Sequence, residues 1–149
     1  MSKHSSEELV PFAHSANNRC FGCGPANNHG LHLDFLRAPD GEVVCLVTVP
    51  HGFEGPPGFL HGGIIATLLD EAMSKAVRAR GHIAMTRHME VDYLRPVGTG
   101  SHIRIEGRVT RSEGRKHWVE SSIQSETHSK LATGKGLFIE IPPKLNRES

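Results

Sequence analysis

One segment of this sequence constrains the fold more than any other, a long amphipathic helix predicted over residues 62–80. Its apolar residues recur with a spacing of 3.6, so they form one broad face that must be buried against another layer. These residues are Ile64, Ile65, Leu68, Leu69, Ala72, Met73, Ala76 and Val77. Gly81 follows at the position where glycine commonly ends a helix. The segment therefore predicts a helix that packs with one face on the core.

Strand-like segments lie on both sides of this helix. Before it, Leu31, Leu33 and Phe35 alternate with polar residues and predict a half-buried strand. Residues 42–49 predict a second strand, paired with the first as a hairpin through a Pro-Asp-Gly turn. After the helix, we expect a meander of antiparallel strands over residues 83–95, 100–111, 115–127 and 130–140. This order of elements predicts an α+β domain with the helix packed across one sheet.

The size and charge of the chain limit the classes of protein to which it can belong. The 149 residues suffice for one domain that needs no metal or disulfide to fold. Seventeen Lys and Arg against 16 Asp and Glu leave a net charge of +1, so charge gives no reason to expect a nucleic-acid or membrane partner. No apolar run approaches the roughly 18 residues that span a bilayer, and the start MSKHSSEE is unlike a signal peptide. The three cysteines are too few for a secreted disulfide framework, so we expect a cytoplasmic protein.

The chain divides into three parts by its patterns. Residues 1–19 show no periodicity, and we expect a loose arm or a short lead-in helix there. Residues 20–141 carry all the predicted elements of the domain, and residues 142–149 form a tail. No repeat or linker divides the domain further.

The predicted helix begins with His61-Gly62-Gly63, a sequence suited to binding a ligand. The first N–H groups of a helix have no partner within it, and the helix dipole adds about half a positive charge there. Glycines let a ligand approach these groups closely, so a polarised carbonyl or an oxyanion would be stabilised. The alternative is a tight turn in which glycine only avoids a clash.

The adjacent acidic residues Asp70 and Glu71 lie in the middle of the helix. Glu71 shares a face with polar neighbours, and we expect it in solvent, where it forms a weak surface pair with Lys75. Asp70 lies at the edge of the apolar face, where partial burial raises the pKa of a carboxyl group toward a catalytically useful value. Asp70 is therefore the better catalytic candidate, although it could also be a structural residue at the helix edge.

Cys20 and Cys23 form a Cys-x-x-Cys motif in a turn-rich loop that extends to Gly30. No second tight pair of ligands completes a zinc site, and no helix follows the motif as in dithiol oxidoreductases. We expect a metal-free loop that packs against the edge of the domain.

Two longer runs resemble a known family: GPPGFLHGGIIATLLDEAM (55–73) and MEVDYLRPVGTGSHIRIEGRV (89–109). They are similar to the acyl-CoA thioesterases of the hotdog fold, in particular to the phenylacetate-pathway and 4-hydroxybenzoyl-CoA branch. The resemblance covers residues 20–141 and includes the Cys-x-x-Cys-Gly segment. It implies an antiparallel sheet wrapped around one long central helix. It also implies sites between two chains, in a homodimer or a tetramer that is a dimer of dimers.

The resemblance assigns roles to individual residues. It implies that the Gly62 N–H polarises the thioester carbonyl, that Asp70 is the nucleophile or general base, and that Thr86 orients water or the carboxylate. His61 would shape the turn near the thioester. The substrate would be an acyl-CoA, with no metal and no cofactor. Further substrate-binding positions are Gly63, Phe59, Met73 and His88, with Arg111, Arg115 and Lys116 at the nucleotide end of coenzyme A. The acyl group would lie between the helices and the sheet, near Phe53, Phe59, Leu60 and Met73.

The spacing within the helix independently favours a shared site. Gly62 and Asp70 are eight residues apart, which is roughly 12 Å along a helix axis. One thioester carbonyl cannot contact both residues of one chain at about 3 Å. Two antiparallel helices related by a dyad would place Gly62 of one chain opposite Asp70 of the other.

Two other functions remain open at this stage. The hotdog fold also carries hydratases and dehydratases, in which a histidine such as His51 or His61 would act with Asp70. A non-catalytic module that binds acyl-CoA or another metabolite would have nearly the same sequence. The spacing from His-Gly-Gly to Asp70 favours the thioesterase.

Overall fold

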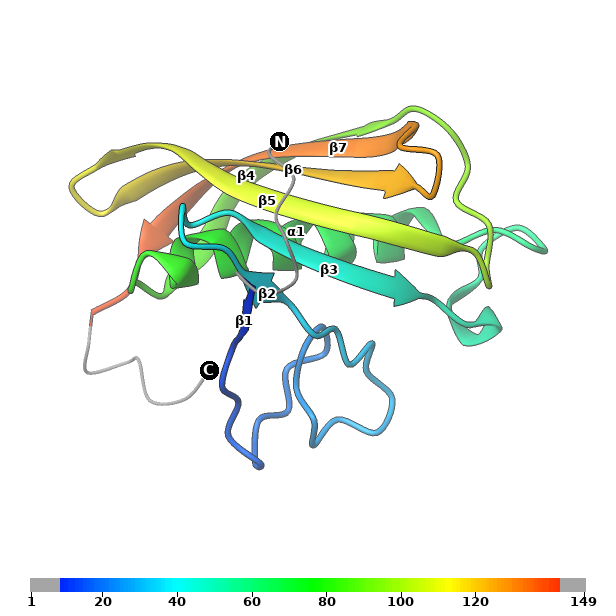
Figure 1. The fold of residues 1–149 in the computed structure, drawn as a ribbon, viewed down its shortest axis with the longest axis horizontal. Helices are drawn as coiled ribbons and strands as arrows, with labels where there is room; N and C mark the ends of the chain where they lie inside the picture. Colours follow the sequence, from blue (N-terminus) through cyan, green and yellow to red (C-terminus); the bar gives the residue numbers. More distant parts are fainter. Residues whose placement is uncertain (1–8, 143–149) are drawn as a thin grey trace.

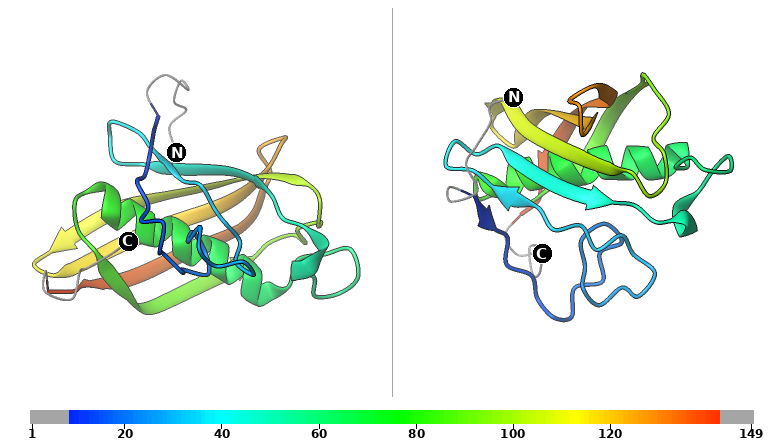
Figure 2. Two further views of the ribbon diagram at one scale, coloured as in Figure 1. Left: turned by 90° about the horizontal axis from the view of Figure 1, so that it is seen from below. Right: turned by 45° about the vertical axis from the view of Figure 1, so that its right-hand side comes forward.

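The structure, a computed structural model, describes residues 9–142. A seven-stranded antiparallel sheet wraps around a single long helix, α1 (Gly62–Ala79), which runs along one face of the sheet (Figures 1 and 2). The predicted helix over residues 62–80 and the α+β class are confirmed. None of the helices within residues 9–142 is both long and apolar enough to cross a membrane.

The strands follow the spatial order β1-β2-β3-β5-β6-β7-β4. Their bounds are β1 Val10–Pro11, β2 Leu36–Arg37, β3 Val43–Thr48, β4 Ala84–Tyr93, β5 His102–Glu113, β6 Lys116–Ser125 and β7 Lys130–Glu140, and a 3-10 turn at His51–Phe53 precedes α1. The four strands predicted after the helix are present, with ends that differ by at most two residues.

The predicted hairpin before the helix is present, but its first strand is short. Only Leu36 and Arg37 pair with β3, whereas residues 31–35 lie outside any strand. Leu33 and Phe35 are nonetheless buried and their polar neighbours exposed, as the alternation predicts. The backbone N–H of Leu33 donates to Gly22 in the Cys20–Gly30 loop, so this segment pairs with a loop instead of a strand.

The prediction that all four strands after the helix form a meander is wrong for the first of them, β4. β5, β6 and β7 do follow one another, but β4 pairs with β7 and lies at the edge of the sheet. The segment after β4 does not form a tight turn, because Val97 is buried and its carbonyl accepts a hydrogen bond from Leu60. The segment packs on the loop before α1 and passes β7 and β6 before the chain enters β5.

The helix lies unusually close to the sheet at two glycines. A Cβ added at Gly107 in β5 would lie 2.4 Å from the carbonyl oxygen of Ala72, and one added at Gly134 in β7 would lie 3.3 Å from Cβ of Leu69. The side chains of Leu69, Ala72 and Met73 are fully buried in this layer. Any larger residue at Gly107 would push α1 away from the core.

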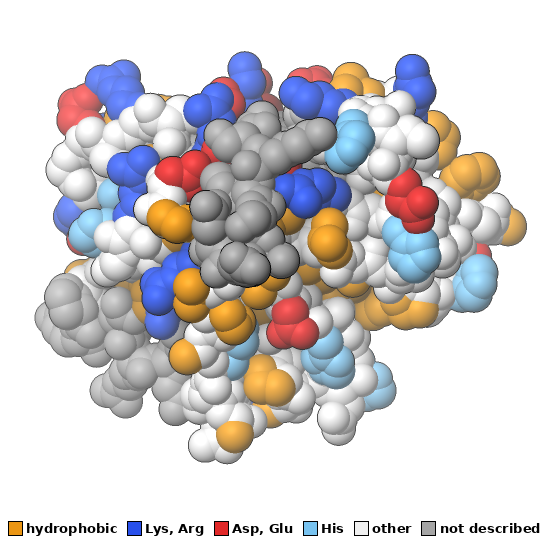
Figure 3. Space-filling view, in the orientation of Figure 1, with side chains coloured by type: hydrophobic (Ala, Val, Ile, Leu, Met, Phe, Trp, Pro, Cys, Tyr) orange, Lys and Arg blue, Asp and Glu red, His pale blue; other side chains and the backbone are white. Residues whose placement is uncertain are grey.

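The N-terminal arm joins the sheet where it is described. Val10 and Pro11 pair with β2, and no helix occurs in residues 9–19. The rest of the predicted arm and, apart from Pro142, the predicted tail 142–149 lie outside the described residues. On the face in Figure 3, Lys and Arg side chains are interspersed with Asp and Glu, in keeping with the net charge of +1.

Candidate active site at the start and middle of the long helix

The start of α1 leaves one backbone donor available. His61 caps the helix, and its Nδ1 accepts a hydrogen bond of 2.9 Å from the Gly63 N–H. No hydrogen bond of residues 9–142 uses the Gly62 N–H. The hydroxyl of Tyr93, at the end of β4, donates to the Gly62 carbonyl at 2.9 Å and holds the turn against the strand. The structure thus leaves Gly62, and not Gly63, with a free donor at the positive end of the helix.

Asp70 lies eight residues further along α1 and is half-buried. The Thr86 hydroxyl in β4 donates a hydrogen bond of 2.5 Å to Asp70 Oδ1. Burial raises the pKa of Asp70 above its ordinary value, and the hydrogen bond from Thr86 opposes this rise. The partial desolvation expected at the edge of the apolar face is therefore present.

The expectation that Glu71 faces solvent is wrong. The Cys20–Gly30 loop covers this side of α1, and a Cβ at Gly22 would lie 2.5 Å from Cγ of Glu71. Burial, followed by the charge of Cys20, raises the pKa of Glu71 to about 7. The hydrogen bond from Cys23 is the main cause that lowers the pKa of Cys20 to about 5.

Lys75 does not form the expected surface pair with Glu71. Its side chain is buried, with 7% exposed, and Nζ lies 3.2 Å from Cys23 Sγ. Its ammonium also lies 5.6 Å from the centre of the Phe12 ring. A helical wheel cannot show this environment, because the covering loop comes from a part of the chain about 50 residues earlier.

The structure separates three expected substrate-binding residues. Phe59 lies partly exposed in the loop before α1, bridged to Gly98. Met73 is fully buried in the core between α1 and the sheet. His88 lines a surface cavity of about 350 Å³ with Trp118 and other residues of the sheet, and no residue of α1 lines that cavity. Within one chain, only Thr86 of the expected β4 residues reaches Asp70.

The expected coenzyme A residues lie at the tip of the β5–β6 hairpin, on the side of the molecule where α1 ends (Figure 1). Arg111 pairs with Glu113 and stacks over the Trp118 ring at 4.5 Å. Arg115 donates two hydrogen bonds to the Glu140 carbonyl, and Lys116 is exposed. The hairpin is basic and accessible, but two of its three cations already have partners.

Tyr93 is a site residue for which the sequence analysis predicts no role. It is the only tyrosine of the chain, and it is followed closely by Pro96. Its hydroxyl fixes the Gly62 carbonyl from the opposite end of β4 to Thr86. The single tyrosine and the nearby proline are visible in the sequence. The contact with Gly62 could not be predicted from them, because it depends on the direction in which β4 runs beside α1.

Known proteins are similar to most of this sequence. The family model described as "Thioesterase superfamily" matches residues 57–132. Acyl-coenzyme A thioesterase THEM4 of Xenopus laevis is 38% identical over 111 residues, which are 73% of this chain and 50% of that protein. THEM4 of Rattus norvegicus is 34% identical over 110 residues, covering 73% and 47% of the two chains. The chain spans about half the length of the curated relatives it matches.

Solved structures share the fold. A crystal structure of a thioesterase superfamily protein superposes with a TM-score of 0.78 at 28% identity, covering 82% of this chain and 60% of the other. The PaaI protein of E. coli, from the phenylacetic acid degradation operon, superposes with a TM-score of 0.70 at 22% identity, covering 75% and 81%. The residues that match the family model include α1, β4 and the whole candidate site. By its fold and by this match, the chain belongs to the hotdog-fold thioesterase superfamily.

Proposed function

We propose that this protein hydrolyses acyl-CoA thioesters to a free acid and coenzyme A, at sites shared between two copies of the chain. The observation that carries the proposal is the pair of groups on α1. A free N–H lies at the positive end of the helix, and a half-buried carboxyl with a raised pKa lies eight residues later. The first group suits the carbonyl oxygen of a thioester, and the second suits a base or nucleophile. The curated relatives named acyl-coenzyme A thioesterases support the same reaction.

The two groups act together only across a dimer, because roughly 12 Å of helix separates them. β4 lies at the edge of the sheet, and among the described strands it pairs only with β7, so its other side is available to a second copy. Antiparallel pairing of two β4 strands about a dyad near residues 89 and 90 would place Thr86 opposite the partner's Tyr93. Thr86 holds Asp70 and Tyr93 holds Gly62, so this pairing brings Gly62 toward Asp70 of the partner subunit.

The reaction then follows from the two groups. The Gly62 N–H donates to the thioester oxygen and stabilises the negative charge that develops on it. Asp70 of the partner subunit either attacks the carbonyl carbon or takes a proton from a water held by Thr86. The carbon–sulfur bond breaks, the thiolate leaves as coenzyme A and gains a proton, and water supplies the hydroxyl of the acid. The basic hairpin Arg111–Lys116 would contact the phosphates of coenzyme A.

Substitutions at Gly62 test the role of the free N–H directly. Gly62→Pro removes this N–H at the first helical position, where proline fits, and His61 before it already has the extended backbone that proline requires. Gly62→Ala keeps the N–H, and its Cβ would make only an ordinary contact of 3.7 Å with Tyr93. We expect free-thiol release from a panel of short, medium and aromatic acyl-CoAs to fall about 10²–10³-fold in Gly62→Pro. Gly62→Ala should retain most of it.

Asp70→Asn tests the carboxyl group in the same assay. It removes the charge with little change in size, and we expect turnover to fall about 10²–10⁴-fold. Asp34→Asn, at an exposed position outside the site, is the control and should leave turnover unchanged. Conversion of enoyl-CoA without thiol release would show a hydratase instead. Binding of acyl-CoA without any turnover would show a binding module.

A further inference from the structure

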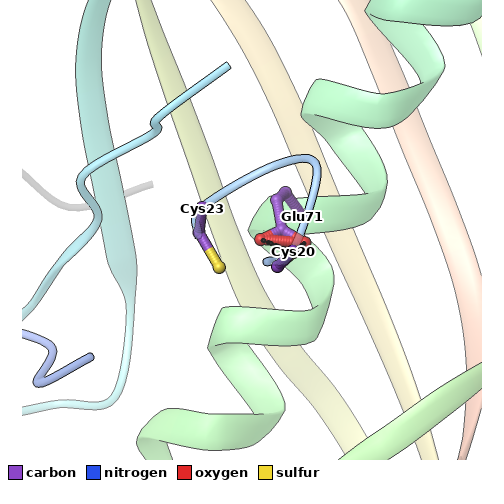
Figure 4. A group of neighbouring side chains, drawn as sticks. All are labelled: Cys20, Cys23 and Glu71. Atoms are coloured by element: carbon purple, nitrogen blue, oxygen red, sulfur yellow. Dashed lines mark hydrogen bonds between the residues drawn. The ribbon is translucent and has the colours of Figure 1, made fainter. Parts of the chain in front are cut away.

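The loop that covers α1 brings three metal-ligating side chains together outside the proposed active site. Cys20, Cys23 and Glu71 each offer a ligand atom, and these atoms all lie within 4.8 Å of one another (Figure 4). The two cysteines come from the tight loop, and the carboxylate comes from the middle of α1. The sequence argues against zinc because no second tight pair of ligands completes the Cys-x-x-Cys motif. The structure brings a third ligand from the helix.

The distances in the cluster also fit a tetrahedral ion. Cys20 Sγ lies 3.7 Å from Oε1 and 3.9 Å from Oε2 of Glu71, so without an ion the thiol donates a long hydrogen bond to the carboxylate. Zinc bonds of about 2.3 Å to sulfur and about 2.0–2.2 Å to oxygen place neighbouring ligands of a tetrahedron roughly 3.5–3.8 Å apart. The sulfur and the carboxylate are therefore at the separation that a shared ion requires.

A divalent ion also suits the charges that the cluster would carry as ligands. Two thiolates and one carboxylate would then place three negative charges in a partly buried site, and these need compensation. Lys75 offsets one of them, since its buried Nζ lies 3.2 Å from Cys23 Sγ. A divalent ion would balance the remaining two, and Lys75 would support one of its sulfur ligands by a hydrogen bond.

A cavity beside the cluster has room for a fourth ligand. Its volume is about 200 Å³, and its lining includes the three candidate ligands together with Asn18 and Arg78. Asn18 Nδ2 is buried and has no hydrogen-bond partner among the described residues. A water or hydroxide on the ion would complete four-coordination and give this N–H group an acceptor.

We propose that Cys20, Cys23 and Glu71 bind a zinc ion, with a water or hydroxide as the fourth ligand. The mixture of thiolates and a carboxylate suits Zn²⁺, whereas the hard cations Ca²⁺ and Mg²⁺ prefer oxygen ligands alone. The ion fastens the Cys20–Gly30 loop to α1 at the residue next to Asp70. This proposal replaces the metal-free loop expected from sequence, and it does not depend on the proposed hydrolysis.

Cobalt provides a spectroscopic test on the full chain. The protein is reduced, freed of metal with a chelator and titrated with Co²⁺. We expect one equivalent to bind per chain, with the thiolate-to-cobalt charge-transfer band and the visible bands of a tetrahedral site. Zn²⁺ should displace the cobalt, because it binds such sites more tightly. The double variant Cys20→Ser/Cys23→Ser should lose the charge-transfer band.

Two further variants test whether the cobalt spectrum comes from this site. Cys45→Ala removes a buried cysteine of β3 outside the cluster and should leave the cobalt spectrum unchanged. Glu71→Gln keeps both thiolates but should weaken cobalt binding at least about tenfold.

A measurement on the unmodified chain covers the case in which a variant does not fold. Zn²⁺ should protect Cys20 and Cys23 from alkylation, as mapped by mass spectrometry. The proposal is overturned if the reduced chain shows no charge-transfer band, or if the double variant shows the same band. A Cys20–Cys23 disulfide that forms in air, in a chain that takes up no metal when reduced, would also overturn it and assign the pair to redox chemistry.

Discussion

At Asp70, two effects on the pKa oppose each other, and one of them can be removed separately. Burial raises the pKa, and the hydrogen bond from Thr86 lowers it. Thr86→Ala removes this hydrogen bond, so the pKa of Asp70 should rise further. Because the proposed reaction needs the ionised carboxylate, the acid limb of the kcat/KM profile should move to higher pH.

Thr86→Ser is the control for this shift, because it keeps the hydroxyl and should keep the limb near its original pH. The measurement is kcat/KM for one acyl-CoA across the acid range. If the acid limb does not move in Thr86→Ala, the limb does not report the ionisation of Asp70.

Cys45 allows a second prediction at the scale of one residue. Burial raises the pKa of its thiol to about 12. At pH 8, only about one thiol in 10⁴ is then ionised, and the thiolate is the reactive form. Cys45 should therefore escape alkylation in the folded protein and react fully in urea. Rapid labelling of Cys45 without urea, detected by mass spectrometry, would mean that β3 opens easily.

At the scale of the element, the sequence predicted α1 well because the 3.6 spacing of its apolar residues depends only on local geometry. It failed at Glu71, since the wheel treats the helix as if it were alone in solvent. The glycine at position 22 lets a distant loop lie directly on the carboxylate. The sequence of the helix contains no signal that predicts this loop.

The strand β4 shows a different limit of sequence analysis. Regular alternation would place Thr86 and His88 on the same face of the sheet. The register shifts between them, so Thr86 pairs with Phe138 and His88 pairs with the adjacent Leu137. The irregularity turns Thr86 toward Asp70 and His88 toward Trp118 on the other face. The composition of the strand contains no signal for it.

The contact between α1 and β5 gives a stability prediction for this pair of elements. Gly107→Ala would place a Cβ 2.4 Å from a backbone oxygen of the helix, and backbone cannot move aside cheaply. We expect the free energy of unfolding to fall by about 1–3 kcal/mol in urea denaturation, as for other overpacked cores. Gly52→Ala, where a Cβ meets nothing within 4 Å, is the matched control and should change it by less than about 0.5 kcal/mol. Equal effects of the two substitutions would show that α1 moves freely from the sheet.

At the scale of the whole molecule, a mixing experiment distinguishes shared sites from sites within one chain. Asp70→Asn chains and Gly62→Pro chains are each expected to be nearly inactive as homodimers. Each mixed dimer would contain one site with both groups intact and one site with neither. Unfolding and refolding the two together in equal amounts should therefore restore about a quarter of the original activity. No recovery, with mixed dimers demonstrated by mass spectrometry, would place the whole site in one chain.

The close seating of α1 on the sheet has a consequence for motion. Where the helix backbone touches Gly107, there is no layer of side chains that could slide or change rotamer between the two elements. The amide hydrogens of the middle of α1 and of β5 should then exchange with solvent only when the whole domain opens, at one common rate. Gly62 and Asp70 lie on this one rigid helix, so in the proposed shared site the distance from the Gly62 N–H to Asp70 of the partner subunit could change only if one chain moved against the other.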